Sequence, residues 1–302
     1  MTEGDSPTVA RRRVRLAIRE ARDAAGLTQN QVAEAMEWSH SKVIRIESGE
    51  VSISPNDLRP LMSYLGIKDR AVTAALIADA RIARTRQRQA WYQKPEFREH
   101  MSDALRHLIE YEVEATAMRS YTVYYPPGPL QTPAYAAALT GAWTHEIPAE
   151  RLAKIVEARR LRHEMMLGRL ESMQVFMVLD QSVFERQIGG PSVLAEQLQE
   201  LHDLAGRGLI NIRMLPFDMD SPIANNGSFD LLTIGGESGD EVLYRENGLT
   251  DELVEDVATT ARHRERFEQL WQVARTEVDT IDFIKGRIET LWTKVSGRQS
   301  QT

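Results

Sequence analysis

The stretch TQNQVAEAMEWSHSKVIRIESGE, from Thr28 to Glu50, holds two short amphipathic segments on either side of a polar turn. Thr28 and Gln31 stand at the N-cap and N3 positions of a capping box, which predicts that a helix begins here. Ser39 can cap a second helix, which we expect to end at Ser48–Gly49. The apolar positions follow helical spacing and predict one packed face, made of Val32, Ala33, Met36, Val43 and Ile46.

The second of these helices carries polar side chains on its outer faces or at its start. They are Ser39, His40, Ser41, Lys42 and Arg45. Side chains at the exposed N-terminal end of a helix can reach base edges in the major groove of DNA while the helix N-terminus faces phosphate. The alternative for each residue is a solvated helix face, but caps, apolar stripe and turn spacing together favour a DNA-reading helix.

The residue types suggest different roles at the DNA. Arg45 can bond a guanine through two hydrogen bonds, and His40 and Ser41 can donate or accept. Lys42 is better suited to a phosphate contact. Gln29, at the start of the preceding helix, can bridge backbone phosphate to the reading helix. We also count Asn56 among the expected DNA-binding residues.

The flanking sequence extends the pattern to a domain of five helices. One helix precedes the quoted stretch and ends at Gly26, and another opens at Ser54-Pro55 with proline at N1 and ends at Gly66. A longer helix is expected over residues 69–90, becoming basic towards its end. We therefore predict a disordered arm over residues 1–9, a DNA-binding domain over 10–80 and a helical linker over 81–97.

Residues 10–80 resemble the phage-repressor-type (XRE-type) helix-turn-helix domain, and the shared frame is GLTQNQVAEAMEWSHSKVIRIESG, residues 26–49. The resemblance implies that His40, Ser41 and Arg45 stand at base-reading positions and Gln29 at a phosphate position. It also implies a partly buried ion pair between Glu47 and Arg22. One position departs from the frame, because the turn has Glu37 where glycine is usual. We expect either a strained left-handed residue, at a cost of about 1 kcal/mol, or another turn shape.

The charge of the chain is unevenly distributed. Residues 1–94 hold 16 Lys and Arg against 11 Asp and Glu, whereas residues 95–302 hold 21 against 33. A basic front part on an acidic body fits a chain whose N-terminal part meets phosphate. The chain has no cysteine, no signal-peptide pattern and no long uncharged apolar run, so we expect a cytoplasmic, nucleoid-associated protein without disulfides or membrane spans.

The remainder predicts a helix-rich α+β domain with a small sheet over residues 98–290, followed by a tail over 291–302. Short apolar runs predict strands at 173–180, 210–217, 227–236 and 241–248. Helical patterns cover 149–170, 192–206 and 251–275, and another begins near Ser102. The fold class is thus mainly α with a smaller α/β part.

This second part resembles the C-terminal domain of unknown function that follows XRE-type domains in many actinobacterial regulators. The likeness covers residues 90–285, and its most specific pieces are Gly189-Gly190, Leu215-Pro216-Phe217 and Gly227-Ser228-Phe229. The run PPGPLQT, residues 126–132, is less apolar than is usual there. The resemblance implies an antitoxin-like transcriptional regulator with a small partner protein encoded next to it.

Other functions of the C-terminal part remain open at this point. An enzyme is one, since Asp180, Glu185 and Arg186 follow a strand, but no metal-binding spacing, GxSxG sequence or Walker loop is present. His107 and Glu110 lie three apart on a helix and could be two metal ligands, against the alternative of a solvated pair. We expect no catalytic residue, no metal and no cofactor.

Small-molecule sensing and dimerisation are the other possibilities. An apolar pocket could be lined by Tyr124, Tyr125, Trp143, Phe176, Phe184 and Phe229, although ordinary core packing explains each of them as well. Helix-turn-helix proteins usually bind two half-sites about 34 Å apart as a dimer. We therefore expect a homodimer on double-stranded, palindromic operator DNA, with the dimer contact supplied by the acidic part.

Overall fold

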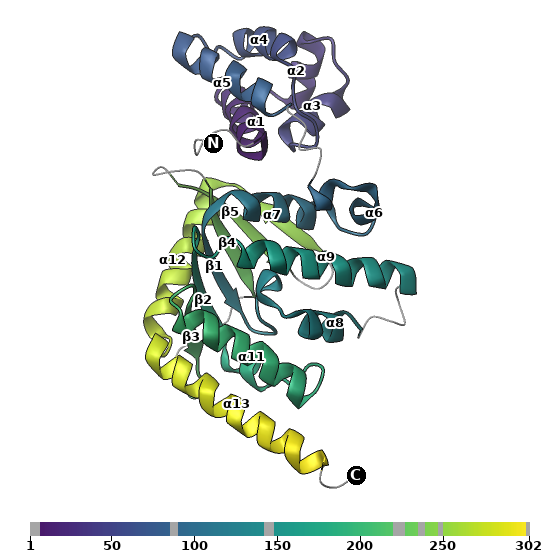
Figure 1. Cartoon of the computed structure of the whole chain (residues 1–302). Coiled ribbons are helices and arrows are strands. Elements are labelled where there is room, and N and C mark those ends of the chain that lie inside the picture. The colour runs from purple at the N-terminus through teal and green to yellow at the C-terminus, as the bar shows by residue number, and fades with distance from the viewer. Residues whose placement is uncertain are drawn as a thin grey trace. The chain divides into compact units, whose positions relative to one another are not determined.

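The computed structural model describes residues 7–84, 90–141, 148–219, 227–234, 239–246 and 250–299 (Figure 1). The chain forms two compact units, divided between residues 89 and 90. Helix α1 begins at Pro7, so residues 7–9 of the expected arm are helical, while residues 1–6 lie outside the described part. None of the helices in the described part is long and apolar enough to cross a membrane.

The N-terminal unit consists of five helices around one core. They are α1 (Pro7–Ala24), α2 (Gln29–Ala35), α3 (His40–Glu47), α4 (Pro55–Tyr64) and α5 (Arg70–Ile82). Helix α1 packs against α3 and α5, and α2 packs against α3. Val32, Val43 and Ile46 are buried in the shared core, together with Ile18 and Leu58. The apolar spacing of the sequence thus becomes the contact face of each helix.

Helix α5 is shorter than the sequence pattern suggested. It ends at Ile82, followed by a turn at Ala83 and Arg84, whereas a helix to residue 90 was expected. Ala83 still belongs to the buried face of the helix, whereas Arg84 is exposed. A helix in water needs such a packed face to be stable, and good helix formers alone do not extend it. Residues 85–89, in the expected linker, lie outside the described part.

The C-terminal unit begins with short helical turns and continues as an α+β domain. Its first elements are η1 (Trp91–Gln93), α6 (Pro95–Arg98), α7 (Asp103–Glu114), β1 (Ala115–Thr122), η2 (Gly128–Leu130), α8 (Pro133–Gly141) and α9 (Ala149–Leu167). Then follow β2 (Gln174–Asp180), α10 (Gln181–Glu185), α11 (Pro191–Gly206), β3 (Asn211–Leu215), β4 (Phe229–Ile234), β5 (Asp240–Glu246), β6 (Asp251–Val254), α12 (Val257–Val273) and α13 (Glu277–Gln299).

The six strands form one mixed sheet in the order β3-β2-β1-β4-β5-β6. Strands β1, β2 and β3 run parallel, and β4, β5 and β6 pair antiparallel to their neighbours. Met118 in the middle of β1 lies opposite Val175 on one side and Leu232 on the other. The carboxyl end of β1 therefore meets the start of β4 and the end of β5 at one edge of the sheet.

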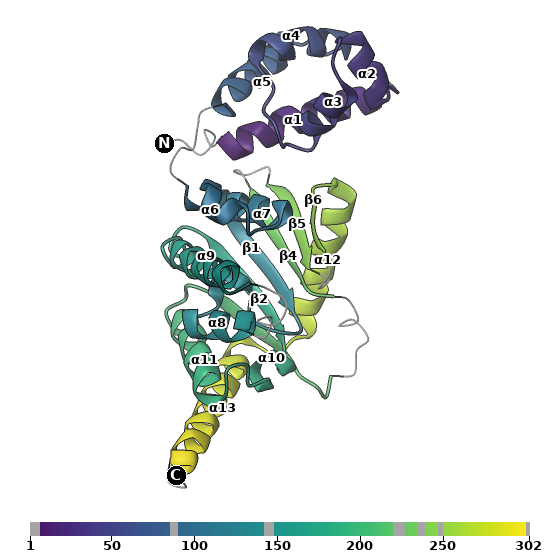
Figure 2. The same ribbon diagram turned by 90° about the vertical axis from the view of Figure 1, so that its right-hand side faces the viewer.

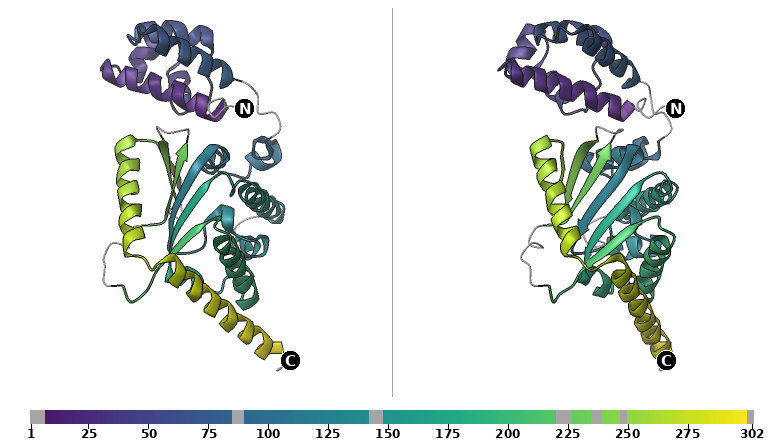
Figure 3. Two further views of the ribbon diagram at one scale, coloured as in Figure 1. Left: turned by 60° about the vertical axis from the view of Figure 1, so that its left-hand side comes forward. Right: turned by 90° about the vertical axis from the view of Figure 1, so that its left-hand side faces the viewer.

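Helices cover both faces of the sheet. Helix α12 lies along one face, and α7, α8, α9 and α11 lie on the other side, as Figure 2 and the left view of Figure 3 show. Helix α13 packs against α11 and β3, and its C-terminal end projects beyond the rest of the unit (Figure 2). The segment 291–299, expected as a tail, is the last part of this helix.

Two strands were not predicted from the sequence. Strand β1 follows α7 without a single linking residue, so no glycine, proline or polar turn marks the change. Residues 251–254 form the edge strand β6, although the helix of this region was expected to start at 251; it starts at Val257. In both places strand pairing outweighs local preference, since β-structure depends on cross-strand neighbours.

Candidate nucleic-acid interface and C-terminal cavity

Helix α3 presents its polar residues outward, as the DNA-reading interpretation requires. Ser39 caps the helix, and its Oγ accepts a hydrogen bond from Lys42 N at 3.3 Å. His40 and Ser41 in the first turn are exposed, and the Arg45 side chain is 56% exposed. Their exposure follows from the burial of Val43 and Ile46, which turn the opposite face into the core.

The far end of α3 is anchored by Glu47. Its buried carboxylate accepts hydrogen bonds from Arg22 Nε at 2.7 Å and Arg22 Nη2 at 3.0 Å. Gln29 Nε2 also donates to Glu47, at 2.8 Å. The hydrogen bond and charge of Glu47 raise the pKa of Arg22 despite partial burial. Helices α1, α2 and α3 thus share one carboxylate, and Gln29 lies where it links the start of α2 to α3.

Both cationic side chains of the candidate reading face have an acidic neighbour. Lys42 Nζ lies 3.3 Å from Asp57 Oδ2 and 3.9 Å from the ring centroid of Trp38. Arg45 Nε lies 3.3 Å from Glu50 Oε2. All four charged side chains are at least one-third exposed, so each pair contributes little to stability. Either cation can exchange its carboxylate for a phosphate or a base at low cost.

Asn56 lies next to this face. It is exposed in the first turn of α4, immediately before Asp57, which contacts Lys42. Helix α4 begins with Ser54 as N-cap, whose Oγ accepts from Asp57 N at 3.0 Å, and with Pro55 in its first turn. The structure therefore brings the starts of α3 and α4 together on one exposed surface. The residues predicted as DNA contacts, from Gln29 to Asn56, all lie in this unit.

The turn between α2 and α3 has the left-handed conformation. Glu37 has a φ of 56°, and among the described residues it is the only non-glycine with positive φ. Its side chain is exposed. The turn therefore keeps its geometry without the glycine, and the strain is taken by the backbone of Glu37. Of the two expected alternatives, the structure has the left-handed residue and not another turn shape.

The candidate catalytic and metal residues of the C-terminal unit have structural contacts. Asp180 caps α10 by accepting from Ser182 N at 2.8 Å, and Glu185 forms an ion pair with Arg287 at 2.8 Å. Glu110 accepts a hydrogen bond from Gln93. Within the residues that the structure describes, no group of three His, Cys, Asp or Glu side chains could hold a metal ion.

The aromatic residues proposed for a pocket are divided between several places. Tyr124, Tyr125 and Phe229 line one cavity. Phe176 instead packs edge-on against Trp271, and Phe184 against Phe283. Trp143 lies outside the described residues. Three of the six residues are therefore together, and Phe176 and Phe184 belong to separate contacts elsewhere.

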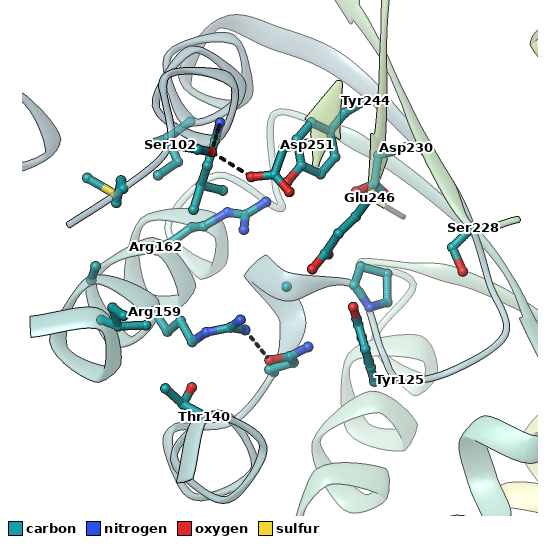
Figure 4. Close-up of a pocket in the computed structure, with 18 of the residues that line it drawn as sticks. Ser102, Tyr125, Thr140, Arg159, Arg162, Ser228, Asp230, Tyr244, Glu246 and Asp251 are labelled. Atoms are coloured by element: carbon teal, nitrogen blue, oxygen red, sulfur yellow. Dashed lines mark hydrogen bonds between the residues drawn. The ribbon is translucent and has the colours of Figure 1, made fainter. Parts of the chain in front are cut away.

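This cavity has a volume of about 550 Å³ and lies between α9 and one edge of the sheet. Helix α9 contributes Arg159 and Arg162 to one wall. The end of β1, the start of β4 and the end of β5 contribute the opposite wall, with Asp230 and Glu246. Figure 4 shows both guanidinium groups directed into the open space that Glu246 and Tyr125 face from the other side.

The two arginines of α9 have different partners. Arg162 is bound by Glu112 through two hydrogen bonds, of 2.5 and 2.8 Å, and both side chains are buried. Arg159 donates to the amide oxygen of Gln131 at 3.0 Å. Burial and the neighbouring Arg162 lower the pKa of Arg159, although a guanidinium remains charged at any physiological pH. No carboxylate of the described residues forms an ion pair with Arg159.

The negative charges on the opposite wall of the cavity also lack cationic partners among the described residues. Asp230 accepts a hydrogen bond from Ser120 Oγ at 2.5 Å, and burial raises its pKa to about 6. Burial, with the nearby charge of Glu246, raises the pKa of Tyr125. Asp251 accepts from Ser102 Oγ at 2.5 Å. The cavity thus holds separated positive and negative groups.

Sequence reasoning did not find these cavity residues. Their signal is the face of α9 formed by positions 151, 155, 158, 159 and 162, where three arginines share a face with Ile155 and Ala158. A buried arginine on such a stripe indicates a paired carboxylate or a ligand site. The acidic residues on β4 and β5 carry no local signal, because only the strand order places them opposite α9.

Comparison with known proteins supports the division into two parts. Residues 105–286, more than half of the chain, match a family described as a domain of unknown function, DUF5753. Residues 14–76 match a helix-turn-helix domain family. No curated protein and no solved structure shows significant similarity. The helix-turn-helix match, together with the exposed polar face of α3, makes the chain a DNA-binding regulator.

Proposed function

The chain belongs to the DUF5753 family, and we propose that it is a sequence-specific transcriptional regulator of the XRE type. The observation that carries this proposal is the outer face of α3, where His40, Ser41 and Arg45 are exposed while Glu47 anchors the other end of the helix. A reading helix must be both rigid and accessible, because base recognition requires fixed side-chain positions at the groove.

The roles of the single residues follow from their place. We assign base contacts to His40, Ser41 and Arg45, and phosphate contacts to Lys42 and Gln29. Ser39 and Asn56, at the starts of α3 and α4, are assigned to the flanking backbone. The amide of Gln29 already binds Glu47, so it can hold α3 and a phosphate at the same time.

We propose that the protein acts as a homodimer on a palindromic operator in the cytoplasm, associated with the nucleoid. A single reading helix covers few base pairs, and two copies on half-sites about 34 Å apart supply the required specificity. The acidic C-terminal unit is the proposed dimerisation part. An antitoxin-like role, with control by a small protein encoded next to the gene, remains part of this proposal.

The proposal is tested by selecting binding sites from random-sequence duplex DNA with the full chain. We expect an enriched palindrome, bound by two copies of the chain in analytical ultracentrifugation. A parallel selection with Arg45→Ala and His40→Ala together should lose the enrichment. If the wild-type chain enriched no sequence at physiological salt, the assignment of α3 as a reading helix would be wrong.

A second candidate concerns how the regulator receives its signal. The cavity of about 550 Å³ in the C-terminal unit favours small-molecule sensing, because its size falls within the roughly 300–1,000 Å³ of ligand pockets. We propose a binding role for this unit and no catalysis, since Asp180 and Glu185 are engaged in a helix cap and an ion pair. Co-purification with the neighbouring small protein would instead favour control by a partner.

A further inference from the structure

The cavity of the C-terminal unit lies where ligands of open sheets commonly bind. In α/β sheets that place is the crevice beyond the carboxyl ends of the parallel strands, at the point where the strand order reverses. Here β1 ends at Thr122 beside the antiparallel β4, which begins at Phe229. Thr122 and Phe229 both line the cavity. The topology therefore leaves an opening at this edge, which α7 and α9 border.

The positive side of the cavity consists of three arginines of α9, of which Arg151 is exposed. Arg162 is neutralised by the buried carboxylate of Glu112. Arg159 has only the neutral amide of Gln131 as hydrogen-bond partner among the described residues. A partly buried guanidinium without a carboxylate is unfavourable, and an anionic ligand group would compensate it through a bidentate pair.

The negative side holds three carboxylates, from Asp230, Glu246 and Asp251. None of them forms an ion pair with a described residue, and Asp230 and Asp251 are bound only by serine hydroxyls. Burial is the largest cause of the raised pKa of Asp230, and the nearby Glu112 and Glu246 add to it against the opposing effects of the Ser120 hydrogen bond and the charge of Arg162. A protonated amine placed here would be attracted by several carboxylates at once.

Aromatic rings also line the cavity. Tyr121, Phe229 and Tyr244 line the cavity and are buried. The three carboxylates also outnumber the two arginines that have no carboxylate partner among the described residues, Arg159 and the exposed Arg151, which disfavours a phosphorylated or other multiply anionic ligand. The arrangement instead favours a ligand that carries opposite charges at its two ends and has an apolar part.

We propose that this cavity binds a small zwitterion of the size of a di- or tripeptide, with its amine at Asp230 and Glu246 and its carboxylate at Arg159. The cavity, at about 550 Å³, has room for more than one amino-acid residue. This inference deepens the sensing candidate and rests on it for its biological meaning. It does not depend on DNA binding, because ligand binding is measured on the protein alone.

The test uses the full chain and a panel of free L-amino acids and dipeptides that combine Phe, Ala, Lys and Glu. Binding is detected by a thermal shift at millimolar concentration and quantified by calorimetry. For each ligand found, the N-acetylated and C-amidated forms are compared with the free form. We expect blocking either end to weaken binding about tenfold or more, as a charged hydrogen bond contributes roughly 1.5–3 kcal/mol.

Two substitutions assign the ends of the ligand. In Arg159→Gln, C-amidation should no longer weaken binding, whereas acetylation still does. In Asp230→Asn, the effect of acetylation should decrease while that of amidation remains. Arg160→Gln is the matched control, because Arg160 lies next to Arg159 on α9 but forms a surface ion pair with Glu164. It should bind the free peptide as the wild type does.

Three results would overturn the proposal, and none requires a variant to fold. The first is that no member of the panel binds the wild-type chain. The second is that end-blocked and free peptides bind within twofold of one another. The third is that inorganic phosphate binds while no zwitterion does. If a dipeptide binds without changing affinity for operator DNA, the site stands and the sensing function fails.

Discussion

The guanidinium of Arg22 donates two hydrogen bonds, of 2.7 and 3.0 Å, to the carboxylate of Glu47, which lies 25 positions later in the sequence. Both side chains are largely buried, and Arg22 also donates to Leu27 O at 2.9 Å. The pair therefore fixes the end of α3 to α1 and to the turn before α2. Because α3 is the proposed reading helix, this contact determines how firmly the helix is held against DNA.

Removing Arg22 should destabilise the N-terminal unit strongly. Arg22→Ala leaves the buried Glu47 carboxylate with only Gln29, and we expect a loss of about 3–5 kcal/mol. Hydrogen exchange of peptides within residues 14–76 measures the effect in the full chain. Arg19→Ala, in the same helix but with an exposed side chain 3.9 Å from Asp23, is the control and should change stability by less than about 0.5 kcal/mol. Equal effects of both variants would contradict the anchoring role.

Replacing Glu37 by glycine should stabilise the same unit. The backbone at Glu37 has a φ of 56°, which costs an L-residue about 1 kcal/mol or more. Glycine removes this strain but loses more chain entropy, so we expect a net gain of about 0.5–1 kcal/mol. Glu37→Ala keeps the Cβ and should give no gain. A stabilised Glu37→Ala would point to the charge of Glu37 instead of its backbone conformation.

Arg45 and Lys42 should differ in the kind of DNA binding they support. We expect Arg45→Ala to cost about 1–3 kcal/mol at one base position and to relax the preference there. Lys42→Ala should weaken binding to all sequences alike and lower the salt slope by about 1. Fluorescence anisotropy on single-position variants of the selected site, at several salt concentrations, separates the two. An unchanged base preference in Arg45→Ala would contradict its role.

Glu50 should compete with DNA for Arg45. The two side chains lie 3.3 Å apart in the free protein, and both are about half exposed. Glu50→Gln removes one negative charge beside the reading face, so we expect tighter binding to every sequence, by roughly a factor of two to ten. The base preference should stay as it is. Glu34→Gln, on the exposed side of α2, is the comparison, and an equal gain there would indicate a general charge effect.

Asp230 should make the stability of the C-terminal unit depend on pH. Its pKa is about 6 in the folded unit, above the roughly 3.9 of an unfolded chain. Above pH 6 the folded state therefore carries a penalty of about 1–3 kcal/mol, which disappears as the pH falls towards 4. Asp230→Asn stays neutral and should stabilise the unit at pH 8, with a gain that shrinks below pH 6.

Denaturant unfolding of the full chain between pH 4.5 and 8 measures this difference. The control is Asp218→Asn, whose carboxyl is 81% exposed and 3.8 Å from Arg275. It should show no such pH dependence. A gain from Asp230→Asn that was the same at pH 5 and pH 8 would exclude the titration of this carboxyl as the cause.

The organisation of the N-terminal unit could be predicted because its signals are local. The caps at Thr28, Ser39 and Ser54 lie within three residues of the amides they bind. The inward positions recur every three or four residues, so the outward face of α3 follows from the sequence alone. The end of α5 could not be predicted, since it depends on where the buried surface stops and not on helix preference.

In the C-terminal unit the sequence determined the short apolar strands β2 to β5 and the charged helix α9, because their residues repeat at strand or helix spacing. Only the tertiary structure decided that residues 115–122 form the central strand, since its neighbours β2 and β4 are more than fifty residues away in the chain. The same pairing sets Arg159 opposite Asp230 and Glu246. A cavity with separated charges is a property of strand order, and local sequence preferences contain no information on it.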